Sequence, residues 1–190
     1  MGLMVIGLIL FFIVHGISIV NEPWRDRMVL KLGERFWKGL YALFSIIGII
    51  LVIRGYAMVR TESVVLYFSP AWLSHLAMLL MLPVFPLLLA TYFPARISAF
   101  VRHPMLLATV LWAFAHLLVN GRLADVLLFG SFLVWAVFDL LSMRRRTQRP
   151  VPGAPDSRFN DLIALIVGLG IFGIFVVWLH TVLIGVQLLG

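Results

Sequence analysis

The sequence predicts an all-α protein, a polytopic membrane helix bundle of about six transmembrane helices. Of its 190 residues, 63% are hydrophobic and only 12% are charged. The mean hydropathy of +1.08 lies far above that of soluble domains. The apolar residues gather in stretches that are each near the roughly 20 residues a helix needs to cross a bilayer. Because hydrocarbon offers a backbone no hydrogen bonds, each stretch is expected to be helical.

The six predicted spans follow one another with short connections, and residues 1–190 are expected to form one integral-membrane domain. The first span lacks a basic leader and a small-residue cleavage site, so we expect it to be retained. Pro83 and Pro86 predict a kink in the third span. Pro104 suits the first turn of the fourth, and Asn120-Gly121 is a helix stop. The spans cover residues 3–21, 38–59, 71–92, 104–120, 124–142 and 160–188.

Basic residues predict how the chain crosses the membrane. The first, third and fifth connections hold 12 of the 15 Lys and Arg residues. Positive loops stay in the cytoplasm, so both termini are predicted to face the periplasm. The formal charge of +7 therefore fits anionic lipid headgroups, and no nucleic-acid partner is expected. The first connection, PWRDRMVLKLGERFWKG, is partly amphipathic and is expected to form an interfacial helix.

Several kinds of chemistry are excluded. The chain has no cysteine, which removes disulfides, thiolate metal sites and cysteine nucleophiles. It contains no G-x-S-x-G, H-E-x-x-H or P-loop pattern. The glycines of GLGIFG, residues 168–173, match a dinucleotide fingerprint but lie in the middle of a span. Small residues there are typical of close helix packing instead.

Histidines carry the main functional signal. An ionisable side chain in hydrocarbon is costly and by default marks function, and neutral imidazole is the commonest metal ligand. Without cysteine, the soft ligands available are histidine and methionine. The histidines lie inside or at the mouth of the predicted spans, at positions 15, 75, 103, 116 and 180.

The fourth span is the most informative. Helical spacing places Thr109, Trp112, His116 and Asn120 on one face, which predicts a polar and aromatic stripe that avoids lipid. His116 lies about 18 Å along the helix from Pro104, at 1.5 Å per residue. Two interpretations have equal weight at this point. His116 is either a metal ligand or a polar contact that joins two helices.

His15 lies in the inner half of the first span and, taken alone, favours a structural role. Paired with His116 it forms a standard axial set for haem iron, two imidazoles from two helices. By residue counting His15 is nearer the cytoplasmic side, so this pairing requires a tilted helix or a steep haem plane. His75 and His180 lie near the outer face and favour interfacial roles over a second metal pair.

Arg102 and His103 precede the fourth span at its cytoplasmic entrance. A guanidinium and an imidazole there could hold a carboxylate or phosphate, such as a haem propionate or a lipid headgroup. The alternative is ordinary interfacial anchoring, which the motif favours slightly by itself.

Several of these residues together resemble the NnrU family. The pattern is His15 and Arg25, then the LGERF motif at 32–36 and Tyr41, then Arg102-His103-Pro104 and WAFAH at 112–116. The resemblance covers about residues 1–145, with 160–188 as a further span. It implies a multi-pass protein of a bacterial inner membrane, linked to denitrification and nitrogen-oxide respiration.

A plant relative, 15-cis-zeta-carotene isomerase, extends what the resemblance implies. That enzyme binds haem b through histidines that match His15 and His116, so haem b is the expected cofactor and these two residues its metal ligands. Arg102, His103, Trp112 and Asn120 are the expected cofactor-binding neighbours. Haem-dependent redox or isomerase chemistry on a small lipophilic substrate, or nitric oxide handling, would follow. Ala113 replaces a cysteine of the isomerase, which argues against its ligand-switching chemistry.

Two other function classes fit parts of the pattern. Membrane methyltransferases that act on lipids or isoprenylated cysteine share the Arg-His-Pro start, but they carry glutamates downstream. This chain has no glutamate after Glu62. A non-enzymatic assembly or regulatory subunit without a cofactor is the third class. A haem absorption band separates the first class from both others.

Overall fold

The computed structural model describes residues 1–149 and 151–188, and the regular elements in these residues are helices. Their contacts divide the chain into two compact units. Unit one consists of Met1–Ser69 and Asn120–Gln148, and unit two consists of Pro70–Val119 and Arg149–Gly190. Each unit is therefore described by itself.

Unit one contains the helices α1 (Gly2–Leu32), α2 (Glu34–Val59) and α7 (Leu123–Ser142). Helix α1 kinks at Asn21, whose φ of −151° and ψ of 76° are not helical. The Asn21 side-chain oxygen accepts the Trp24 backbone N–H at 3.0 Å, and Pro23 occupies the first turn of the new helix. The predicted first span thus ends at the kink, and the amphipathic segment beyond it is helical.

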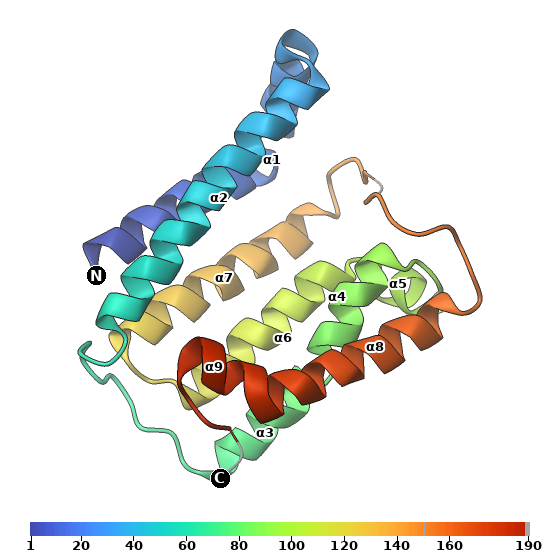
Figure 1. Cartoon of the computed structure of the whole chain (residues 1–190). Helices are drawn as coiled ribbons and strands as arrows, with labels where there is room; N and C mark the ends of the chain where they lie inside the picture. The colour runs from blue at the N-terminus through green and yellow to red at the C-terminus, as the bar shows by residue number, and fades with distance from the viewer. Residues whose placement is uncertain (150, 189–190) are drawn as a thin grey trace. The chain divides into compact units, whose positions relative to one another are not determined.

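The LGERF motif forms the corner between α1 and α2. Gly33 has a φ of 84°, a conformation that a residue with a Cβ adopts only with strain. Its N–H donates to the Val29 carbonyl at 2.9 Å, and its carbonyl accepts the Trp37 N–H at 3.1 Å. Gly33 thereby ends one helix and starts the next, and α1 and α2 pack along each other as a hairpin (Figure 1).

Glycines allow the backbones of α1 and α2 to approach closely. A Cβ on Gly7 would lie 2.6 Å from the Val52 nitrogen, and one on Gly55 would lie 2.6 Å from Met4 Cα. A Cβ on Gly48 would lie 3.1 Å from Phe11 Cα. Small residues at such contacts are how membrane helices pack without a hydrophobic driving force.

Two buried carboxylates stand near the ends of α7, and one of them joins the helix to α2. Asp125 accepts the Tyr56 hydroxyl at 2.7 Å and the Arg122 N–H at 3.2 Å, at the start of α7. Asp139, near the other end, forms an ion pair with Arg146 and accepts the Ser142 hydroxyl. The Asp125 bond ties the start of α7 to α2, and the Asp139 bonds close the end of α7 on itself; all are charge-assisted, which is the stronger kind.

Unit two contains the remaining helices. Proline breaks the third span after Met81, which confirms the predicted kink, and α6 begins at Pro104 and ends before Asn120-Gly121. The elements are α3 (Trp72–Met81), α4 (Val84–Tyr92), α5 (Arg96–Val101), α6 (Pro104–Val119), α8 (Asn160–Ile174), the π-helix η1 (Phe175–Leu179) and α9 (His180–Ile184). The last span is therefore helical to Ile184, and 185–188 are not.

Helix α4 packs against both α6 and α8 in unit two. Val84, Leu87 and Ala108 form the buried core between α4 and α6. On the other side, a Cβ at Gly168 of α8 would lie 2.5 Å from the Pro86 nitrogen. Cβ atoms at Gly170 and Gly173 would meet nothing within 4 Å. Of the glycines in GLGIFG, Gly168 therefore provides the predicted close helix packing.

The predicted all-α, multi-pass architecture is confirmed. Across the described residues, five helical stretches are long and apolar enough to cross a bilayer. The other apolar helix, α6, has 16 residues. At 1.5 Å per residue it is about 24 Å long, shorter than the roughly 30 Å hydrocarbon core. The chain is a membrane protein by this pattern of helices.

Candidate functional site

His15 lies half-buried on α1 among aromatic side chains of unit one. Its Nδ1 is 2.8 Å from the Phe11 carbonyl oxygen, one turn earlier. A carbonyl can only accept, so Nδ1 carries the proton, and in the neutral imidazole Nε2 then keeps its lone pair. The imidazole stacks on the Phe11 ring at 3.9 Å between centroids. The Tyr41 and Trp135 rings lie 4.9 and 5.7 Å from it.

Trp135, on α7, brings a buried polar atom to this cluster. Its Nε1 is buried, and among the residues that the structure describes it has no hydrogen-bond partner. Leaving a buried donor unsatisfied costs about 1–3 kcal/mol. An acceptor on a bound ligand beside His15 would remove that cost. Sequence reasoning missed Trp135, although it precedes Asp139 by four residues and so shares its helix face.

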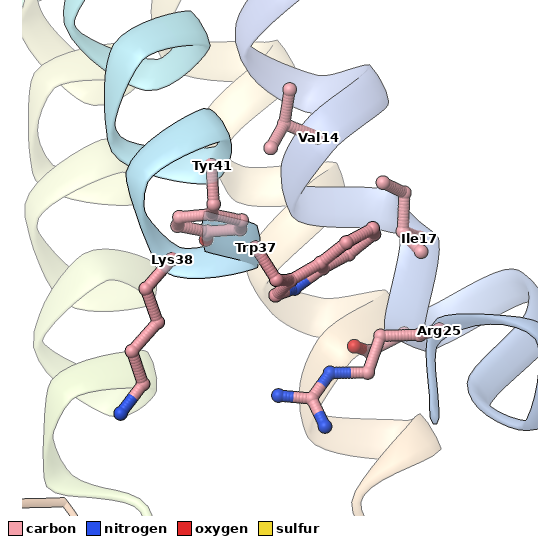
Figure 2. Close-up of a pocket in the computed structure, with 7 residues that line it drawn as sticks. Val14, Ile17, Arg25, Trp37, Lys38 and Tyr41 are labelled. Carbon is pink, nitrogen blue, oxygen red and sulfur yellow. The ribbon is translucent and has the colours of Figure 1, made fainter. Parts of the chain in front are cut away.

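A cavity of about 220 Å³ adjoins the His15 cluster through Tyr41. Figure 2 shows the Arg25 guanidinium and the Lys38 ammonium extending beyond the Trp37 indole, away from Val14. Arg25 also pairs with Asp26 at 2.9 Å, and Lys38 with Glu34 at 2.7 Å. The cavity is apolar at one end and cationic at the other. Its lining residues are Val14, Ile17, Ser18, Arg25, Trp37, Lys38 and Tyr41.

His116 has the same local arrangement on α6 of unit two. Its Nδ1 is 2.8 Å from the Trp112 carbonyl oxygen, again one turn earlier, so Nε2 again keeps its lone pair. The Trp112 and His116 rings are 5.3 Å apart between centroids. Thr109 donates its hydroxyl to the Met105 carbonyl of its own helix at 2.9 Å. Trp112 and His116 are thus the pair that the structure brings together.

Asn120 lies one residue beyond the end of α6, so it does not continue the predicted helical stripe. It belongs to unit one, where its carbonyl accepts the Tyr67 hydroxyl at 2.9 Å. The adjoining Gly121 carbonyl accepts the Leu66 N–H at 2.7 Å. The physical reason is the Asn-Gly stop itself, because it turns the chain out of the helix and into a loop contact.

Arg102 and His103 lie at the opposite end of α6 from His116. Arg102 has a φ of 65° and a ψ of −43°, and the His103 N–H donates to the Val101 carbonyl at 2.8 Å. The two residues therefore form a tight turn just before Pro104. The rise of the helix separates Pro104 from His116 by about 18 Å. Arg102 and His103 are not brought beside the His116 imidazole.

The remaining histidines are both in unit two. His75 is exposed on α3. His180 contacts the Phe175 ring, and its Nδ1 is 2.8 Å from the Val186 carbonyl oxygen. Among the described residues, no group of three or more His, Cys, Asp or Glu side chains could hold a metal ion. A haem iron would need only two imidazole ligands from the protein.

Comparison with known families decides where the chain belongs. Residues 3–188 match the family model described as NnrU protein. The chain belongs to the NnrU family. The match includes the last helical span, so the family likeness extends beyond residue 145, where the quoted motifs end. No curated protein and no solved structure matched the chain.

Proposed function

We propose that this NnrU-family membrane protein binds haem b, with His15 and His116 as the axial ligands. One observation carries the proposal. In each histidine the Nδ1–H is held at 2.8 Å by the carbonyl one turn earlier in its own helix, whereas His180 contacts the Val186 carbonyl beyond the end of its helix. Metal-bound histidines are oriented in the same way, because this hydrogen bond fixes the tautomer and raises the basicity of Nε2. Each imidazole is thereby prepared to donate to iron.

The surroundings of His15 suit such a group. The rings of Phe11, Tyr41 and Trp135 form an apolar wall that would exclude water, and the Trp135 N–H would gain an acceptor. Arg25 and Lys38 in the adjoining cavity would hold carboxylates by charge-assisted hydrogen bonds. On α6, the Trp112 ring would flank the second ligand. Arg102 and His103 lie at the opposite end of α6 from Trp112 and His116, and Asn120 lies beyond the end of that helix, so none of the three is given a role in holding the haem.

Bound haem would supply one-electron chemistry, and a small gas would bind to it only by displacing one of the two imidazoles. The proposed role is therefore haem-dependent redox or isomerase chemistry on a small lipophilic substrate, or nitric oxide handling in nitrogen-oxide respiration. The protein's own contribution is to fix the ligand tautomers and to keep the site dry, which together set the properties of a haem centre.

Protein purified after expression with ample haem supply is expected to carry haem b. A Soret band and a pyridine haemochrome assay, referred to protein concentration, measure the occupancy. With both axial positions filled by imidazole, the spectrum should be low-spin. The double variant His15→Ala/His116→Ala is the matched control and should be colourless. A folded wild-type protein that stays colourless and resists reconstitution would refute the proposal.

We further propose that both termini lie in the periplasm of a bacterial inner membrane. The basis is the 12 of 15 Lys and Arg residues in the odd connections. Alkaline phosphatase fused after the last residue should be active, and green fluorescent protein there should be dark. The same reporters inserted in the 148–158 connection should give the reverse pattern. Fluorescence from the C-terminal fusion would place the C-terminus in the cytoplasm and contradict the proposed orientation.

A further inference from the structure

A second cavity, of about 740 Å³ and widely open to its surroundings, lies in unit two where the segment around α5 meets the start of α8. The His15–His116 proposal does not use it. Three arginines line it, from two segments about 60 residues apart in the sequence. The charged residues of the lining are Arg96, Arg102, Arg158, Asp156 and Asp161.

Hydrogen bonds from Asn160 and to Asp161 hold the two walls of this cavity together. The Asn160 side chain is 3% exposed and donates to the Pro94 and Pro155 carbonyls at 2.9 and 3.0 Å. The Asp161 carboxylate accepts the backbone N–H groups of Arg96 at 3.2 Å and Ile97 at 3.0 Å. The cavity is therefore built by specific contacts, and Asp161 is committed to the backbone of α5.

The charge of the cavity is positive. Arg96, Arg102 and Arg158 face two aspartates, one of which is Asp161. Within residues 1–149 and 151–188, none of these arginines forms an ion pair, and Arg158 lies over the Phe159 ring at 4.9 Å. Guanidinium groups match phosphate oxygens with paired hydrogen bonds, which makes arginine the preferred residue for phosphate recognition. The cavity thus has the chemistry of a phosphate site.

Arg102 holds its position at a conformational cost. Its φ of 65° places a residue with a Cβ in the region that glycine normally occupies. Strain of this kind persists where surrounding structure enforces it, and it gathers at functional sites. Glycine would relieve the strain but would remove the guanidinium. A role of the Arg102 guanidinium in binding would explain why arginine, and not glycine, occupies this strained position.

Exposed apolar side chains close in sequence to the lining arginines indicate where the ligand comes from. Phe100, two residues before Arg102, is 90% exposed, and Phe159, which follows Arg158, is 53% exposed. This segment connects the kinked third span to α6, so it lies at a membrane surface. Aromatic side chains at that depth contact lipid, and adjacent arginines contact headgroups. A free phosphate ion has no apolar part that could contact the two phenyl rings, whereas a phospholipid has acyl chains.

We propose that this cavity binds the phosphate of an anionic phospholipid, with Arg96, Arg102 and Arg158 as its ligands and Phe100 and Phe159 beside the acyl chains. Lysine would supply the charge but not the paired hydrogen bonds. The site is separate from the haem ligands, because α6 places Arg102 and His116 at its two ends. The lipid proposal therefore does not depend on whether the protein binds haem.

Full-length protein purified in detergent tests the proposal by thermal unfolding and by retention of lipid in native mass spectrometry. We expect phosphatidylglycerol to raise the Tm by several degrees, and phosphatidylcholine or inorganic phosphate at the same concentration to leave it unchanged. The triple variant Arg96→Ala/Arg102→Ala/Arg158→Ala should bind phosphatidylglycerol at least tenfold more weakly. The triple variant Arg27→Ala/Arg144→Ala/Arg145→Ala removes the same charge from exposed positions outside the cavity and should bind as wild type.

The single variant Arg102→Gly gives a second, independent readout. It should raise the Tm without anionic lipid, because the strained φ is relieved, and reduce the gain from phosphatidylglycerol. Equal losses in the two triple variants would show general charge attraction and overturn the site. Stabilisation by inorganic phosphate equal to that by phosphatidylglycerol would overturn the lipid as its ligand. Should the first triple variant fail to fold, Arg102→Gly and Arg102→Lys decide the question.

Discussion

His15→Ala and His116→Ala are each expected to lose haem or to convert it to a high-spin form, whereas His75→Ala and His180→Ala keep the wild-type spectrum. Removing an axial imidazole opens one coordination position on the iron, which moves the Soret maximum or lowers the occupancy. His75 is exposed on α3, and His180 is in the short terminal helix α9. Optical spectra of the four variants at matched protein concentration are the measurement.

A structural role for either histidine would give a different result. His15→Gly and His116→Gly leave a space that exogenous imidazole can enter, so millimolar imidazole should restore the low-spin spectrum if the residue is a ligand. A residue that only joins helices would not respond in this way. Arg102→Ala should retain the spectrum, because Arg102 lies at the far end of α6. An indispensable His75 or His180 with a silent His15 would move the site to unit two.

Much of the helical fold could be predicted because the signals that define it are local. Pro83 breaks the third span and Pro104 starts α6, each through the geometry of its own ring. The kink at Asn21 carries an equally local signal in the Asn-Glu-Pro-Trp sequence that caps the new helix. Hydropathy predicts the spans because each helix that crosses a bilayer must be long and apolar enough by itself, whatever its neighbours are.

The surroundings of the site could be predicted only in part. Trp112 and His116 share a helix, so their proximity follows from the spacing of four residues. The contacts of His15 with Tyr41 and Trp135 join three helices, and no local pattern specifies which side chains meet across them. Asn120 was placed on the α6 stripe by helical spacing, yet the Asn-Gly stop ends that helix first. The three-arginine cavity depends on Asn160, whose contacts are long-range.

Gly55→Ala is expected to destabilise the α1–α2 hairpin, whereas Gly39→Ala on the same helix is expected to stabilise it. A Cβ at Gly55 would lie 2.6 Å from Met4 Cα, and Met4 is fully buried. The clash is with backbone, so α1 and α2 must move apart, and overpacking of this kind costs roughly 1–3 kcal/mol. A Cβ at Gly39 would meet nothing within 4 Å. There the helix gains roughly 0.5–1 kcal/mol, because alanine loses less backbone entropy than glycine.

Thermal unfolding of both variants in one detergent measures the change in Tm relative to the wild type. Gly55→Ala should lower the Tm and Gly39→Ala should raise it. The separation of α1 from α2 also sets the contact between His15 and Tyr41, whose rings are 4.9 Å apart. Gly55→Ala should therefore lower haem retention at temperatures where the protein remains folded, and Gly39→Ala should leave it unchanged. Two variants with the same Tm would mean that α1 and α2 are not in backbone contact at Gly55. In that case the close packing of α1 on α2 at Gly55 could not be what positions Tyr41 beside His15.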